Sequence, residues 1–179
     1  MNLKKLTIII CLIWTAIVAC WVIKDEYTLI TGKEVLLKTI PVDPKDLLMG
    51  DYVTLNYAIS RIPYKLQNPD FYANEEVFVV LKIDENNIAS IDNILTGNNP
   101  PHALCIKGKI SKNNASSFRN ARIVYGIESY YVKEHTGRIL EKDLRNGALV
   151  RVRIDKYGNA KVKGFAENKS LNHALPNVR

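Results

Sequence analysis

A long uninterrupted apolar run opens the chain. Residues 6–23 read LTIIICLIWTAIVACWVI and carry no charged side chain. As a helix with a rise of about 1.5 Å per residue, this run spans roughly 27 Å, close to the roughly 30 Å hydrocarbon core of a bilayer. Trp21 and Tyr27 lie near its end, where aromatic rings favour the membrane interface. We therefore expect a transmembrane helix over residues 6–23 that ends over residues 24–32, with Gly32 as its C-cap.

The charges beside this run predict its orientation. Lys4 and Lys5 precede it, whereas Lys24, Asp25 and Glu26 follow it with a net charge of −1. Because positive charge is retained on the cytoplasmic side, residues 1–5 are expected in the cytoplasm and the rest of the chain outside.

Two alternatives to an uncleaved anchor stay open. A cleaved secretory signal has an apolar core of about 7–15 residues before a small-residue cleavage site, and here the apolar run continues past Ala19 to Ile23. The stretch from Ile17 to Cys20 (IVAC) resembles a bacterial lipobox, in which Cys20 is the lipidated residue. All three alternatives place the main domain outside the cytoplasm.

Short strand-like runs separated by turn residues follow from residue 33. Residues 52–60 alternate, with the apolar side chains of residues 53, 55, 57 and 59 on one face. Further strands are expected over 77–83, 88–94, 103–110, 122–132, 149–155 and 160–165, the last two as a hairpin. The one helix expected outside the membrane covers 138–146 and ends at Gly147. The pattern predicts a mainly β domain over 33–167, an antiparallel sandwich or barrel with one short helix, and a flexible tail over 168–179.

Residues 41–51, which precede the strand expected over 52–60, predict a capped helical turn. Asp43 is suited to the N-cap position and Pro44 to the first helical position, where its missing N–H is not needed. Asp46 lies in the first turn, where a negative charge is favoured, and Gly50 can take the left-handed conformation that ends the turn. Asp51 then leads into the strand.

The same segment carries a resemblance to a known family. Residues 50–57 (GDYVTLNY) fit G-D-Y-x-x-L-x-Y without a mismatch, and residues 42–47 (VDPKDL) are similar to V-D-P-R-D-L, with Lys in place of Arg. Residues 31–35 (TGKEV) and 125–132 (YGIESYYV) are similar to two further landmarks, in the same order. The chain thus resembles the GDYXXLXY family of membrane-anchored bacterial proteins. The motif residues are Asp43, Pro44, Asp46, Gly50, Asp51, Tyr52, Leu55, Tyr57, Tyr125, Gly126, Glu128 and Tyr130.

The resemblance implies a place in the cell more than a reaction. Family members are envelope proteins without an established activity, and their genes tend to lie beside those of multi-span membrane proteins. The implied location is the bacterial cytoplasmic membrane, with the main domain extracytoplasmic. The implied partners are the membrane itself and a multi-span membrane protein.

Composition adds a moderate positive charge to this picture. The chain is 47% apolar, which excludes a disordered protein, and 25 Lys and Arg against 18 Asp and Glu give a net charge of +7. The C-terminal hairpin is basic, and two interpretations stay open: a solvated face over the core, or attraction to anionic lipid headgroups or wall polymers. Nucleic acid is not an expected partner outside the cytoplasm. The basic residues are Arg151, Arg153, Lys156, Lys161 and Lys163.

Motifs for metal, cofactor or nucleophilic chemistry are missing from the sequence. His102, His135 and His173 are more than 30 residues apart, and neither a CxxC nor an HExxH motif occurs. Cys105 stands alone in the exported part and is expected to be buried filler. We therefore expect no metal and no cofactor.

Two functional hypotheses follow. The first is a non-catalytic accessory or interaction domain for another membrane protein. The second is an envelope glycan- or lipid-binding module or hydrolase, in which Asp51 and Glu128 form a carboxylate pair and Tyr52, Tyr57 and Tyr130 offer stacking surfaces.

The same motif residues also have a structural interpretation, which the sequence favours. Asp51 then accepts backbone N–H groups at its turn, and Glu128 pairs with an arginine such as Arg138. The motif tyrosines, Tyr125 among them, are then core residues with hydrogen-bonded hydroxyls.

Overall fold

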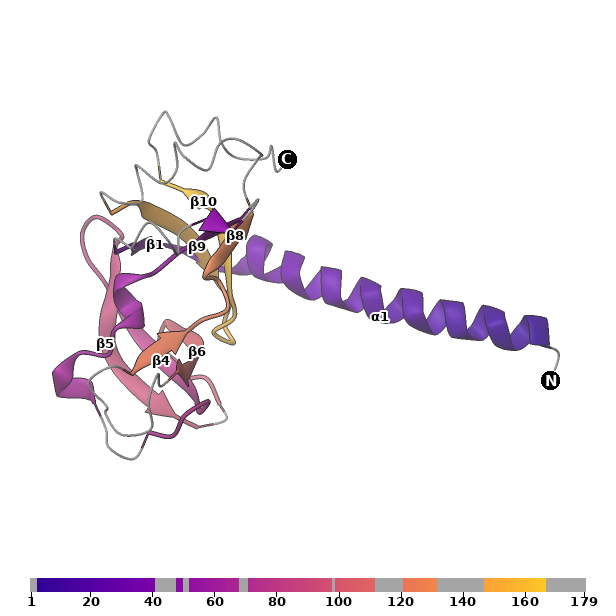
Figure 1. Cartoon of the computed structure of the whole chain (residues 1–179), viewed down its shortest axis with the longest axis horizontal. Coiled ribbons are helices and arrows are strands. Elements are labelled where there is room, and N and C mark those ends of the chain that lie inside the picture. Colours follow the sequence, from indigo (N-terminus) through magenta and orange to yellow (C-terminus); the bar gives the residue numbers. More distant parts are fainter. Residues whose placement is uncertain are drawn as a thin grey trace.

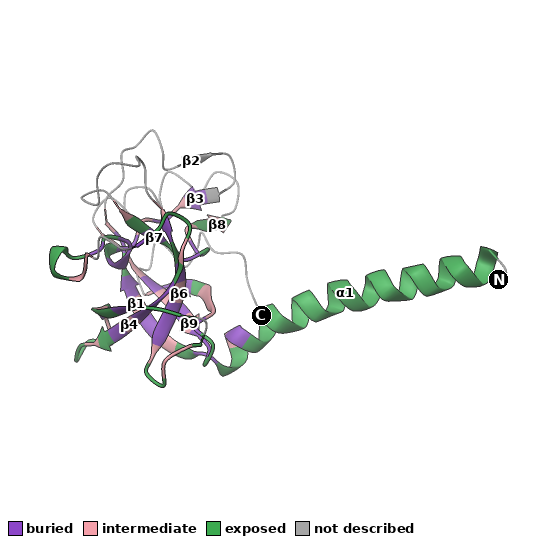
Figure 2. Ribbon diagram, turned by 90° about the horizontal axis from the view of Figure 1, so that it is seen from below, coloured by how far each residue is buried: buried purple, intermediate pink, exposed green. Residues whose placement is uncertain are grey.

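A long helix, α1 (Leu3–Thr31), projects from one end of a β domain (Figure 1). The computed structural model describes residues 3–40, 48–49, 52–67, 71–97, 99–111, 121–131 and 147–166, with the backbone alone at residues 48, 49 and 52. Nearly all side chains of α1 are exposed (Figure 2), and Thr28 near its end is buried. Within the described ranges, α1 is the one helix long and apolar enough to cross a membrane, a test that a signal sequence also passes.

The end of α1 confirms the predicted boundary but gives the glycine a different reason. Gly32 follows the helix and donates its N–H to the Thr28 carbonyl at 3.0 Å. The expected C-cap required a left-handed backbone conformation, and the backbone of Gly32 is not left-handed. A Cβ at residue 32 would instead lie 2.5 Å from the Thr28 carbonyl oxygen and 2.9 Å from the Ile154 nitrogen. Glycine is needed because a strand passes against the helix end.

The β domain consists of three antiparallel sheets. Their strand orders are β1-β9-β10, β2-β3-β8 and β5-β4-β6-β7. The strands are β1 (Lys33–Lys38), β2 (Leu48–Met49), β3 (Tyr52–Thr54), β4 (Glu76–Ile83), β5 (Ala89–Thr96), β6 (Cys105–Ser111), β7 (Arg122–Val124), β8 (Ser129–Tyr131), β9 (Leu149–Ile154) and β10 (Ala160–Phe165). Two 3-10 turns, η2 (Ala58–Ser60) and η3 (Tyr64–Leu66), lie between β3 and β4.

One apolar core joins the three sheets in a sandwich-like arrangement. Alternate residues of β9, Val150, Val152 and Ile154, are almost fully buried. They belong to one cluster with buried side chains from β1, β3, β4, β6 and β7. The described strands do not close into a barrel. The predicted class is therefore confirmed: one apolar helix followed by a mainly antiparallel β domain.

Most predicted strands occur within a residue or two of their expected positions. These are β4, β5, β6 and the β9–β10 hairpin, in which β9 pairs with β10 across the turn from Asp155 to Asn159. The expected pairing of residues 77–83 with 88–94 is present as β4 against β5.

Two predicted strands are shorter than expected. The run over 52–60 forms strand only in β3 and then turns into η2, and Ser60 is buried although its pattern predicted a polar face. The run over 122–132 divides into β7 and β8, which belong to different sheets. The break falls at Gly126, whose φ of +77° lies in the left-handed region.

The predicted helical turn before residue 51 is wrong at its end. Leu48 and Met49 form strand β2, which pairs with Val53 and Tyr52 of β3. Strand pairing here overrides the local capping signals. Residues 41–47, 50–51, 138–146 and 168–179, and thus Asp43, Pro44, Asp46, Gly50, Asp51, the predicted short helix and the predicted tail, lie outside the described residues.

Candidate functional site

The last tyrosine of the GDYVTLNY stretch, Tyr57, is a core residue. Its side chain is 0% exposed and its hydroxyl donates to the Ile127 carbonyl at 2.8 Å. Its backbone forms a bridge to Thr39. Burial raises the pKa of the phenol, with a smaller contribution from the Glu128 charge. Tyr57 is therefore a neutral hydrogen-bond donor inside the domain.

Tyr125, the first residue of the downstream stretch, makes a similar contact in the opposite direction. This side chain is also buried, and its hydroxyl donates to the Ile59 carbonyl at 2.6 Å. Burial again raises the pKa of the phenol, as does the charge of Glu128. Tyr57 thus reaches a backbone carbonyl within the downstream stretch, and Tyr125 reaches the carbonyl of Ile59, two residues beyond the upstream stretch. We call this pair of contacts the tyrosine clasp.

Backbone hydrogen bonds continue the clasp along β3 and β8. Thr54 pairs with Ser129 and Val53 pairs with Tyr130 in the antiparallel register. The Leu55 N–H donates to the Glu128 carbonyl at 2.6 Å. Two stretches more than 60 residues apart in the sequence therefore form one structural unit.

The Glu128 side chain closes a turn. Its Oε1 accepts the Tyr125 N–H at 2.6 Å, across the turn that contains Gly126. The predicted partner Arg138 and the proposed catalytic partner Asp51 both lie outside the described residues. Glu128 therefore stabilises its own turn by accepting a backbone N–H. The sequence predicted the same kind of role for Asp51 at a different turn.

The remaining motif side chains that the structure describes also serve packing. Leu55 is 1% exposed. Tyr130 is half-buried and its ring meets the Phe165 ring edge-on, with centroids 5.4 Å apart. At Tyr52 only the backbone is described, and it pairs with Tyr131. Of the three proposed stacking surfaces, Tyr52, Tyr57 and Tyr130, the fully buried Tyr57 offers no ring face to a ligand.

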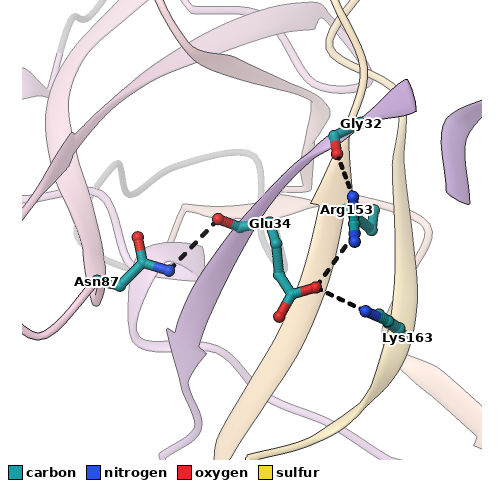
Figure 3. A network of polar contacts seen from close by, with 5 residues as sticks. All are labelled: Gly32, Glu34, Asn87, Arg153 and Lys163. Carbon is teal, nitrogen blue, oxygen red and sulfur yellow. Dashed lines mark hydrogen bonds and ion pairs between the residues drawn. The ribbon is translucent and has the colours of Figure 1, made fainter. Parts of the chain in front are cut away.

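Three of the basic residues of the C-terminal hairpin are paired with carboxylates. Glu34 Oε2 accepts from Arg153 Nε at 3.2 Å and from Lys163 Nζ at 2.8 Å (Figure 3). Arg153 Nη1 also donates to the Gly32 carbonyl at 2.9 Å, next to the end of α1. Lys161 forms an ion pair with Asp25 of α1 at 2.7 Å. These contacts tie β10 and β9 to β1 and to the helix.

The Glu34 network predicts a pH dependence of stability. Hydrogen bonding by Lys163, together with the charges of Lys163 and Arg153, holds the Glu34 pKa below its ordinary value of 4.5. A carboxylate with a lowered pKa stabilises the fold above its unfolded-state pKa, and this contribution is lost as the pH falls through the folded-state pKa. Glu34→Gln is expected to lower the free energy of unfolding by up to about 1 kcal/mol at pH 7 and by less at pH 3. Urea unfolding of both proteins at both pH values measures this, and an equal difference at pH 7 and pH 3 would contradict it.

A buried contact between α1 and the β9–β10 turn was not predicted. Asp155 is 6% exposed, and its Oδ2 accepts the Thr28 hydroxyl of α1 at 2.9 Å. The same carboxylate accepts the N–H groups of Tyr157 and Asn159 at 2.8 and 3.0 Å and the Asn159 side-chain amide at 2.9 Å. The sequence signal for the turn is the Asp at its first position, but nothing in the sequence pointed to Thr28.

The cysteines differ in their surroundings. Cys105 is buried in β6, which confirms the predicted core role, and burial raises the pKa of its thiol. Cys20 is exposed on α1, which continues without a break to Thr31. Its lipidation stays a prediction. Within the described part of the chain, His, Cys, Asp and Glu side chains form no group of three that could hold a metal ion.

Comparison with known proteins gives one match. A family model described as GDYXXLXY protein matches residues 14–165, from the apolar run to the end of β10. No curated protein matches the chain. No solved structure matches it either.

Proposed function

The chain belongs to the GDYXXLXY family, and from this premise we propose that it is a membrane-anchored extracytoplasmic protein of the bacterial envelope. In this proposal its β domain is a non-catalytic interaction module for another membrane protein. The family match begins within the candidate anchor, at residue 14, and runs to the end of the β domain, which supports one functional unit made of both parts.

The observation that carries the proposal is the junction between α1 and the hairpin. Thr28 is 2% exposed and hydrogen-bonded to the buried Asp155, and Lys161 pairs with Asp25 one turn earlier on the helix. The apolar run ends at residue 23, so the last two turns of α1 lie beyond it and contact the β domain through Thr28 and Asp25. A domain joined to its anchor in this way keeps one height and one angle at the membrane. This suits a surface that meets a neighbouring membrane protein.

The motif residues support a non-catalytic role. The hydroxyls of Tyr57 and Tyr125 are buried and occupied by backbone carbonyls, and the Glu128 carboxylate accepts a backbone N–H. A hydrolase needs an acid that faces a substrate cleft. The described half of the proposed Asp51–Glu128 pair is therefore already engaged in the fold.

The proposed orientation is N-terminus inside and β domain outside, from the Lys4 and Lys5 charges. Fusions at the C-terminus test it. Alkaline phosphatase folds only after export, so a C-terminal fusion to it is expected to be active. A C-terminal fusion to a reporter that is active only in the cytoplasm is expected to be inactive. The reverse pattern would exclude this orientation.

Co-purification tests the proposed partner. Tagged protein is recovered from gently solubilised native membranes, and the proteins that accompany it are identified by mass spectrometry. We expect one multi-span protein at constant stoichiometry. Thr28→Val, which loosens the junction and leaves the hairpin turn intact, is expected to reduce its recovery, whereas Asp92→Ala on the exposed side of β5 is not. Recovery of the protein alone and monomeric would contradict the proposal and favour the glycan- or lipid-directed alternative.

A further inference from the structure

The turn between β9 and β10 lies alongside the end of the apolar run of α1. A hollow of about 350 Å³ separates them. Its helix wall includes Cys20, Ile23 and Lys24, and its other wall includes Tyr157 of the turn and Asp155, whose carboxylate is held by hydrogen bonds within the junction. Because the apolar run ends at Ile23, a bilayer around α1 would have its boundary at this hollow. The turn is thus placed at the depth of the lipid headgroups.

The side chains around the hollow are of the kinds that favour this depth. Tyr27 on the helix is 41% exposed and Tyr157 on the turn is 53% exposed. The Lys156 ammonium lies 5.0 Å from the centroid of the Tyr157 ring. Tyrosine and lysine both place an apolar body toward lipid tails and a polar end toward headgroups.

The surface around the helix end carries a positive charge. Two further hollows, of about 410 and 710 Å³, flank the first around the junction. Together the three are lined by six lysines and three carboxylates, a formal net charge of +3. The residues are Lys24, Lys33, Lys107, Lys109, Lys156 and Lys161 against Asp25, Glu76 and Asp155. A positive surface beside a bilayer attracts anionic lipids.

We propose that the hollow between α1 and the β9–β10 turn binds one anionic phospholipid of the surrounding membrane. Its phosphate lies beside Lys24, with Lys156 above the Tyr157 ring, and its upper acyl chain lies against Cys20 and Ile23. The occupant is a phospholipid because the hollow is continuous with the helix surface that the bilayer covers. This inference rests on the membrane-spanning role of α1 in the proposed function and is independent of any protein partner.

Native mass spectrometry of the purified full chain tests the lipid preference. The detergent-solubilised protein is mixed with phosphatidylglycerol or with phosphatidylcholine. We expect one phosphatidylglycerol to be retained in preference to phosphatidylcholine, and Lys24→Gln and Lys156→Gln each to weaken its binding about fivefold. Lys65→Gln, the same charge change on the exposed η3 turn, is the control and is expected to have no effect. Equal retention of the two lipids, or equal effects of the three variants, would overturn the proposal.

Fluorescence quenching in nanodiscs tests the position of the turn. Tyr157→Trp is made with Trp14 and Trp21 replaced by Phe, and nitroxide-labelled lipids are added. Headgroup-labelled lipid is expected to quench Trp at position 157 and not at position 64 of η3, which lines none of the three hollows around the helix end. Absence of quenching at position 157 would overturn the proposal. In the unmodified chain, quenching of the Trp14 and Trp21 emission by chain-labelled lipid reports insertion of α1, so failure of the anchor is distinguished from failure of the lipid site.

Discussion

Replacing Asp155 by alanine is expected to lower the free energy of unfolding by about 3 kcal/mol. The carboxylate accepts two backbone N–H groups of its own turn, the Asn159 amide and the Thr28 hydroxyl. The three donors of the turn lose their acceptor, and the Thr28 hydroxyl, in a site that is 2% exposed, keeps only the longer contact to the Lys24 carbonyl at 3.4 Å. Hydrogen bonds to a charged group contribute about 1.5–3 kcal/mol each, and partial access of water to the turn reduces the total. Chemical unfolding in detergent micelles, followed by circular dichroism, measures the change.

Two variants separate the parts of this effect. Thr28→Val removes the contact between helix and turn, together with the 3.4 Å contact to the Lys24 carbonyl within the helix, and is expected to lower stability by about 1–2 kcal/mol. Asp92→Ala removes a carboxylate on the exposed side of β5 and is expected to change stability by less than about 0.5 kcal/mol. If Asp155→Ala were no more destabilising than Asp92→Ala, the buried junction would not exist in solution.

Tyr57→Ala is expected to be the most destabilising substitution within the GDYVTLNY stretch, by about 4 kcal/mol. The ring is 0% exposed, so truncation leaves a cavity, and the Ile127 carbonyl loses its donor. Tyr57→Phe retains the ring and removes the hydroxyl, so we expect it to lower stability by about 1–2 kcal/mol. Tyr125→Phe is expected to have an effect of similar size, because its hydroxyl makes the reciprocal bond to Ile59. Urea unfolding curves give all three values.

Tyr64→Phe is the matched control for these substitutions. Its side chain is 83% exposed on η3, and loss of its hydroxyl is expected to leave stability unchanged. If Tyr57→Phe instead left stability unchanged and abolished partner binding, the tyrosine would be a binding residue and the clasp would be incidental.

Strand positions were predictable where one physical pattern dominates. In β9 the buried Val150, Val152 and Ile154 alternate with more exposed arginines, because one face of the strand meets the core. In β4 one face meets the core and Phe78 on the other face is also buried, so the signal was β-rich composition in place of alternation. Both patterns are local and survive in a single sequence.

The predicted strands and turn were wrong where a single residue, or a strand distant in the sequence, determines the local structure. Gly126, with φ at +77°, divides the strand expected over 122–132 between two sheets. Leu48 and Met49 follow a good helix-capping sequence but pair with β3. Local propensity is weak compared with such pairing, so neither outcome was visible from the residues alone.

In the candidate site, too, the local features were predictable and the contacts between distant residues were not. The sequence identified the motif stretches and favoured a structural role for their tyrosines, and the structure places Tyr57 and Tyr125 in the core. The sequence could not show that these hydroxyls reach the carbonyls of Ile127 and Ile59, 70 and 66 positions away. Nor could it link Thr28 with Asp155, which are 127 positions apart. The order of two motifs along a sequence does not determine which backbone groups their side chains contact in the folded structure.

The tyrosine clasp gives the family signature a physical reason within this chain. Tyr57 and Tyr125 join the two motif stretches, and Glu128 fixes the turn that precedes β8. The signature in this part therefore describes how the domain holds together. We propose that the surface of the domain and its position on α1 are the features through which a partner is recognised.

The rigid junction between anchor and domain is the claim on which this account depends most, and a distance measurement tests it directly. Spin labels are attached to the native Cys11 on α1 and to Asp92→Cys on β5, with Cys20 replaced by alanine and the buried Cys105 left in place. Pulsed electron paramagnetic resonance in lipid nanodiscs then gives the distribution of distances between the labels. A junction held by the buried Thr28–Asp155 bond predicts one narrow distribution that broadens in Thr28→Val. A broad distribution in the unmodified junction would show that the domain moves freely on its anchor and would contradict the account.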